Sequence, residues 1–201
     1  MARRRLLIAT RNAGKLRELA ELLDSAPFDL VSLDDVGVDD EVEETGETFE
    51  QNAALKAETY CRLSGLPTLA DDSGLEVDAL DGEPGVRSAR YAGEGASDAD
   101  RIAFLVGKLD NIPEDMWSAR FRCVVAVSWP DRPTELYSGA CEGRIVRRGR
   151  GENGFGYDPV FYIPELGKTM AELTPAQKNR ISHRSGAAKK AAAAFVARLT
   201  Q

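Results

Sequence analysis

The sequence has few cysteines, no long apolar run and no excess of basic residues, and each shortage excludes a class of protein. Its three cysteines, Cys61, Cys123 and Cys141, lie far apart and form no Cys-x-x-Cys pair. This spacing excludes a disulfide framework or a zinc site and fits a reducing compartment. The formal net charge of −7 argues against duplex DNA or RNA as the main partner, because proteins that bind them usually carry a basic footprint. The first apolar run ends at Arg11, too early for a signal peptide or a membrane span. We therefore expect a cytoplasmic protein that binds neither nucleic acid nor membranes, with residues 1–5 as a basic lead-in to a strand.

Apolar runs and helix signals alternate along the 201 residues, which is typical of an α/β fold. A content of 43% hydrophobic residues is ample for one domain spanning residues 1–201, with room for two lobes. Capping residues Thr48, Ser97 and Thr174 predict three helix starts, and Gly65 predicts a stop. The expected strands span residues 5–10, 28–32, 119–128 and 134–146, and the expected helices follow residues 15, 48, 97, 174 and 184.

Two adjacent carboxylates, Asp71 and Asp72, follow the apolar residues 68–70. Ser73–Gly74 predicts a turn, and the apolar alternation at residues 75–79 predicts a strand after it. We therefore expect both aspartates at the end of a strand, with only one of the two facing a cleft. Aspartate is also common in turns without any chemical role, and on this segment alone that interpretation carries more weight.

Residues 10–15 form a polar loop between a predicted strand and a predicted helix. A helix that begins there offers free N–H groups to a phosphate. The loop is not a Walker A motif, because Ala9 and Leu16 stand where that motif needs glycine and Ser or Thr. An ordinary strand-to-helix turn explains this segment equally well. The G-x-G-x-x-G pattern at residues 149–154 runs into an aromatic stretch that cannot open a helix, so we reject a dinucleotide fingerprint.

Several of these segments together resemble the inosine triphosphate pyrophosphatase family. The blocks that carry the resemblance cover most of the chain in one order; they are residues 9–15, 44–53, 69–91, 154–158 and 178–184. One departure is Ser185, where we expect glycine in most members. The resemblance implies an elongated α/β fold with two lobes, a long twisted mixed β-sheet flanked by helices, and a central substrate cleft. It also implies a homodimer.

The activity that the resemblance implies is Mg²⁺-dependent hydrolysis of non-standard purine nucleoside triphosphates, namely ITP, dITP and XTP. The products would be the monophosphate and pyrophosphate, so the enzyme would clear these nucleotides from the pool. Rival interpretations are a Maf-type pyrophosphatase acting on modified pyrimidine nucleotides or dTTP, and a nucleotide sensor without catalysis. Intact Asp72, Glu43 and Lys15 argue against the sensor.

The resemblance also assigns roles to residues. Asp72 is the expected catalytic carboxylate and binds the metal together with Glu43, with Asp71 as the alternative for that catalytic role. Arg87 and Arg90 are open between phosphate binding and structural ion pairing, and Tyr157 is as well explained as a core aromatic. The remaining expected substrate-binding residues are Thr10, Arg11, Asn12, Ala13, Gly14, Lys15, Asn52, Lys56, Ser73, Phe155, Gly156, Tyr157, Asp158, Lys178, His183 and Arg184.

Overall fold

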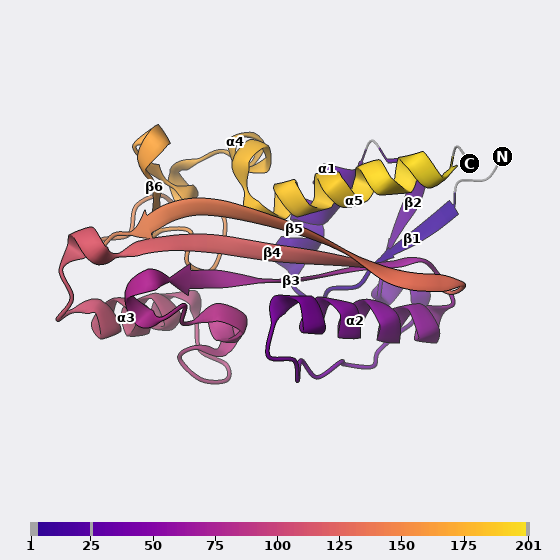
Figure 1. The fold of residues 1–201 in the computed structure, drawn as a ribbon, viewed down its shortest axis with the longest axis horizontal. Helices are drawn as coiled ribbons and strands as arrows, with labels where there is room; N and C mark the ends of the chain where they lie inside the picture. Colours follow the sequence, from indigo (N-terminus) through magenta and orange to yellow (C-terminus); the bar gives the residue numbers. More distant parts are fainter. Residues whose placement is uncertain (1–3, 25, 200–201) are drawn as a thin grey trace. The chain divides into compact units, whose positions relative to one another are not determined.

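The computed structural model describes residues 4–24 and 26–199, so the first three residues of the predicted basic lead-in lie outside the described residues. Figure 1 shows helices packed against a β-sheet, which confirms the expected α/β class. The strands are β1 (Arg4–Ile8), β2 (Phe28–Ser32), β3 (Thr68–Val77), β4 (Ser118–Trp129), β5 (Arg132–Ile145), β6 (Phe161–Ile163) and β7 (Lys168–Thr169). The α-helices are α1 (Ala13–Leu23), α2 (Phe49–Ser64), α3 (Asp98–Leu109), α4 (Pro175–Ile181) and α5 (His183–Leu199). Short 3₁₀ helices span Asp34–Val36, Asp78–Leu80, Gly85–Arg90, Glu114–Met116, Pro164–Leu166 and Met170–Glu172.

The sheet is mixed and has seven strands in the order β2-β1-β3-β4-β5-β6-β7. β1 pairs in parallel with β2 and with β3, where Ile8 lies opposite Leu69. β6 pairs antiparallel with both β5 and β7. β4 and β5 are neighbours joined by two residues, which is the hairpin that the sequence predicts.

The chain divides into two compact units. The first contains residues 1–72, 123–139 and 183–201, and the second contains residues 73–122 and 140–182. In the first unit, α1 and α5 cover one face of the strands and α2 covers the other (Figure 1). A strand covered on both faces must be apolar on both, which explains why β4 is buried continuously from Cys123 onward.

Each unit has its own apolar core. The first core joins Leu19 and Leu23 of α1 to Phe195 of α5 over the strands. The second core joins Leu105 and Leu109 of α3 to strand residues. The burial of these apolar side chains is the main favourable contribution to the folding of each unit.

The structure corrects one expectation about β3. This strand runs without interruption from Thr68 to Val77, so Asp71 and Asp72 lie in its middle and not at a strand end. No turn occurs at Ser73–Gly74, because that pair continues the strand. The predicted alternation ends at Val77, and Ala79 belongs to the following 3₁₀ helix.

Local helix signals are confirmed. Thr48 caps α2 by accepting a hydrogen bond from the backbone N–H of Gln51, and Gly65 ends the helix in the left-handed conformation with φ 69°. Ser97 and Thr174 open α3 and α4 with complete capping boxes. The segment 149–154 opens no helix, as the sequence predicts.

Candidate active site

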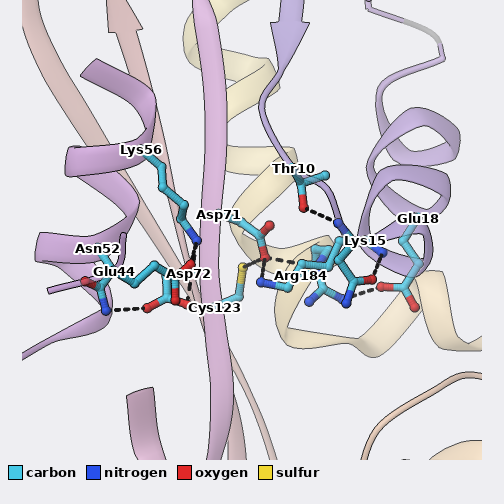
Figure 2. Close-up of polar contacts among 11 residues, drawn as sticks. Thr10, Lys15, Glu18, Glu44, Asn52, Lys56, Asp71, Asp72, Cys123 and Arg184 are labelled. Atoms are coloured by element: carbon cyan, nitrogen blue, oxygen red, sulfur yellow. Dashed lines mark hydrogen bonds and ion pairs between the residues drawn. The ribbon is translucent and has the colours of Figure 1, made fainter. Parts of the chain in front are cut away.

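The first unit brings a group of charged residues to the middle of β3. Asp71 and Asp72 point to opposite sides of this strand (Figure 2), as the two-residue period of a strand requires. Both side chains are buried, with Asp71 1% and Asp72 4% exposed. Because an isolated buried carboxylate is costly, each should have partners, and each does.

Asp72 faces two residues of α2. Asn52 Nδ2 donates a hydrogen bond to Asp72 Oδ2 over 3.1 Å, and Lys56 Nζ lies 3.9 Å from Asp72 Oδ1. Asn52 and Lys56 are one helical turn apart, so both project toward the strand from the same face of α2, as the sequence predicts. Lys56 also forms an ion pair with Glu44.

Burial sets the protonation of this group. It raises the pKa of Asp72 from 3.8 to about 6, and the charge of Glu44 adds to this, while Lys56 and Lys15 act in the opposite direction. Burial alone would lower the pKa of Lys56, but attraction to Asp72 and Glu44 outweighs it and the pKa is raised. Lys56 is therefore a permanent cation beside a carboxylate that titrates near neutral pH.

The acidic segment 39–47 approaches α2 closely at Gly46. Asn52 Oδ1 accepts a hydrogen bond from Gly46 N over 2.7 Å, so one amide side chain joins this segment to Asp72. A Cβ at residue 46 would lie 2.6 Å from Asn52 Oδ1, which explains the glycine. This contact brings Glu44 to Lys56, whereas the predicted metal ligand Glu43 is exposed on the same segment.

The two carboxylates Asp72 and Glu44 fit a magnesium ion that arrives with a nucleotide. The described residues contain no group of three or more His, Cys, Asp or Glu side chains able to hold a metal alone. Mg²⁺ commonly takes one or two carboxylates and completes its shell with phosphate oxygens and water. Asp72 and Glu44, two carboxylates that share one lysine, are such a partial set.

Asp71 lies on the other side of β3 and holds two cations. Its Oδ2 is 3.2 Å from Lys15 Nζ and 3.3 Å from Arg184 Nε, and it accepts a weak hydrogen bond from Cys123 Sγ at 3.8 Å (Figure 2). Arg184 also pairs with Glu18 of α1. Burial raises the pKa of Asp71, but Lys15 and Arg184 outweigh it and the pKa falls well below the usual range. Asp71 is therefore a fully ionised carboxylate that holds Lys15 and Arg184.

Strand, polar loop and helix follow one another as the sequence predicts, but α1 begins at Ala13, so Ala13, Gly14 and Lys15 belong to the helix and not to the loop. Asn12 Oδ1 accepts from Lys15 N over 3.0 Å and caps α1, while Thr10 Oγ1 accepts from Asn12 N over 3.3 Å. No acidic residue lies in the first turn of α1. The positive end of this helix therefore has no carboxylate from its own first turn, and Lys15 adds a cation there.

The second unit holds the predicted Phe155–Asp158 segment. Asp158 Oδ2 accepts from Phe155 N over 3.0 Å and pairs with Lys178 Nζ at 2.5 Å. Lys178 Nζ also lies 4.9 Å from the centre of the half-buried Phe155 ring. Tyr157 belongs to the apolar core, and its hydroxyl donates to Ser88 O over 2.9 Å.

The other predicted residues fall into different surroundings. His183 and Arg184 are buried at the start of α5, and Ser73 follows Asp72 in β3 and is half-buried. Arg87 and Arg90 are exposed. Sequence reasoning missed Glu44, Glu18 and Cys123; only Glu44 had a signal, since it is the immediate neighbour of the predicted Glu43.

Comparison with known proteins identifies the family. A model of the Ham1 family matches residues 6–194. The chain belongs to the Ham1 family. A dITP/XTP pyrophosphatase of Geobacillus kaustophilus is 54% identical over 92% of this chain and 91% of the relative, and one of Bacillus subtilis is 48% identical over 92% and 93%.

Solved structures of Ham1 proteins agree with this. The Ham1 protein of Staphylococcus aureus matches with a TM-score of 0.87 and 43% identity, covering 97% of this chain and 100% of that protein. A nucleoside-triphosphatase / dITP/XTP pyrophosphatase of Mycobacterium abscessus matches with a TM-score of 0.72 and 41% identity over 98% and 96%. The Ham1 relatives are named dITP/XTP pyrophosphatases, so the resemblance to the inosine triphosphate pyrophosphatase family that the sequence motifs indicated is confirmed.

Proposed function

We propose that this chain hydrolyses dITP, XTP and ITP to the nucleoside monophosphate and pyrophosphate, using Mg²⁺. The observation that carries the proposal is geometric: the buried carboxylate of Asp72 is held by Asn52 and Lys56, and Lys56 also pairs with Glu44. A general base must be a positioned group within reach of the proton that it takes. The names of the Ham1 relatives, dITP/XTP pyrophosphatases, support the same activity and substrate class.

Asp72 takes the proton from the attacking water in this proposal. The water oxygen bonds to the α-phosphorus while the bond from that phosphorus to the bridging oxygen of the leaving pyrophosphate breaks. Asn52 orients Oδ2 of Asp72, and Lys56 keeps the ionised form accessible in spite of burial. Phosphoryl transfer needs mainly such positioning and charge neutralisation.

Asp72 and Glu44 are the residues that we propose would hold Mg²⁺, with Glu43 as the alternative from the sequence. When bound, the ion supplies charge neutralisation at the phosphate oxygens. Lys15 and the N-terminal N–H groups of α1 are proposed to bind the triphosphate. In the second unit, Phe155 is proposed to stack on the base, beside Lys178.

Product analysis tests this proposal. The purified protein with Mg²⁺ should release pyrophosphate and the monophosphate from dITP, XTP and ITP much faster than from dATP, dGTP or dTTP. When the reaction runs in water labelled with ¹⁸O, the ¹⁸O should appear in the monophosphate, because the water attacks the α-phosphorus. Release of orthophosphate and the diphosphate would contradict the mechanism, and a preference for dTTP would favour the Maf-type alternative.

A homodimer is also proposed, from the family resemblance. Sedimentation velocity at micromolar concentration checks it, and a monomer throughout the range would contradict it. The described residues include no helix that is long and apolar enough to cross a membrane.

A further inference from the structure

Arg11 makes two long-range contacts that its place in the phosphate-binding motif does not explain. Its Nη2 donates to the carbonyl oxygens of Val38 at 3.0 Å and Asp40 at 3.1 Å. These acceptors are 27 and 29 residues away in the sequence. Both lie where the acidic segment 39–47 begins, so the guanidinium is engaged with backbone and not directed only to solvent.

A second side chain also binds the carbonyl oxygen of Asp40. Tyr60, buried on α2, donates its hydroxyl hydrogen to Asp40 O over 3.0 Å. Arg11, from the loop before α1, and Tyr60, from α2, both donate to the carbonyl oxygen of Asp40. These two long-range contacts anchor the start of the acidic segment.

The other end of the segment is anchored at α2. Gly46 N donates to Asn52 and Glu44 pairs with Lys56. Between the two anchors the chain carries several carboxylates, which repel one another and would favour a solvated loop. The positive charge of Arg11 and its two hydrogen bonds oppose that repulsion.

We propose that Arg11 is a positioning residue. It holds the start of the acidic segment 39–47 so that Glu44 stays at Lys56, beside Asp72, and it does not itself bind the triphosphate. The catalytic consequence rests on the proposed function, whereas the positioning of the segment does not.

Hydrogen exchange in the metal-free protein tests the positioning directly. Arg11→Ala should raise amide exchange in residues 38–47 roughly fivefold or more, the factor expected when a hydrogen bond of ordinary net strength is lost. Tyr60→Phe should raise exchange in the same segment by a smaller factor, and Arg11→Lys should restore part of the protection. Arg17→Ala, which removes an exposed arginine of α1, is the matched control and should change nothing.

Kinetics then separates positioning from substrate binding. Arg11→Ala should raise the Mg²⁺ concentration for half-maximal rate by roughly fivefold, while the KM for dITP at saturating Mg²⁺ changes less than about twofold. A raised KM at saturating Mg²⁺ with unchanged exchange in residues 38–47 would overturn the proposal and make Arg11 a phosphate ligand. Unchanged exchange alone also overturns it. If the wild-type protein does not hydrolyse dITP or XTP, the proposed function fails, and the exchange result still decides the role of Arg11.

Discussion

Replacing each of the two neighbouring aspartates by asparagine should change stability in opposite directions. Burial raises the pKa of Asp72 to about 6, so the ionised form is less favourable in the folded than in the unfolded protein. The pKa of Asp71 is lowered by Lys15 and Arg184 in spite of burial, so its ionised form is more favourable when folded. The asparagine variants keep the side-chain size and remove only the charge.

The size of each effect follows from these environments. A rise from 3.8 to about 6 corresponds to roughly 3 kcal/mol that ionised Asp72 costs above pH 6. This cost is absent below pH 3.8, grows as the pH rises to about 6, and is constant above that value. Asp72→Asn should therefore stabilise the protein by up to about 3 kcal/mol at pH 8, with the gain shrinking toward pH 4. Asp71→Asn removes the buried counter-charge that Arg184 and the half-buried Lys15 share, and breaking a buried ion pair typically costs about 3–5 kcal/mol.

Urea unfolding of the metal-free protein at pH 8 and pH 5 measures both effects. Asp72→Asn should have the higher midpoint and no pyrophosphatase activity, and Asp71→Asn should have a lower midpoint than wild type. Asp24→Asn, at the exposed C-terminal end of α1, is the control and should stay within about 0.5 kcal/mol. If Asp72→Asn loses stability at pH 8, the ionised carboxylate is favoured by its partners, and the reasoning from burial is wrong.

Substitutions at Lys15, at the pair Glu43 and Glu44, and at Gly46 test the candidate site further. Lys15→Ala should lower kcat/KM for dITP by roughly tenfold or more, because a cation at the proposed phosphate site is lost. Unchanged kinetics would leave an ordinary strand-to-helix turn. Glu44→Gln should raise the Mg²⁺ concentration needed for half-maximal rate more than Glu43→Gln does, because Glu44 pairs with Lys56 and Glu43 is exposed. Titrating the rate of both variants with Mg²⁺ measures this, and the reverse order would favour Glu43 as the metal ligand. Gly46→Ala places a methyl 2.6 Å from an amide oxygen of α2 and should lower kcat roughly tenfold with a small change in Tm; a fully active variant would show that the close approach is not required.

Local signals explain which parts of the fold could be predicted. β2 has the predicted bounds of residues 28–32, and α2 begins after Thr48 and ends before Gly65 as expected. These elements are set by apolar spacing and by capping groups within a few residues. The family motifs likewise pointed to the pyrophosphatase activity that the relatives' names support.

Long-range pairing explains what could not be predicted. Ser73 and Gly74 favour a turn locally, yet they remain extended within β3, a strand of the seven-stranded sheet. The partner of Asp71, Arg184, lies 113 residues away, and no local pattern indicates such a contact. The choice between Glu43 and Glu44 depends on the approach of Gly46 to α2, a tertiary contact that a run of acidic residues conceals.

The different environments of the two aspartates also bear on which one is the base. Asp71 Oδ2 lies beside Lys15 and Arg184, and its pKa is far below neutral, so it is a poor proton acceptor at the pH of the reaction. In the metal-free protein Asp72, on the other side of the strand, has a pKa raised to about 6 by burial, so it accepts a proton more readily than Asp71 does. Two titratable groups whose environments push their pKa values apart divide into a structural and a chemical role. The period of a single strand creates that division here, because it sends one carboxylate to the cations and the other to Asn52 and Lys56. The electrostatics thus favour Asp72 over Asp71 independently of the family resemblance.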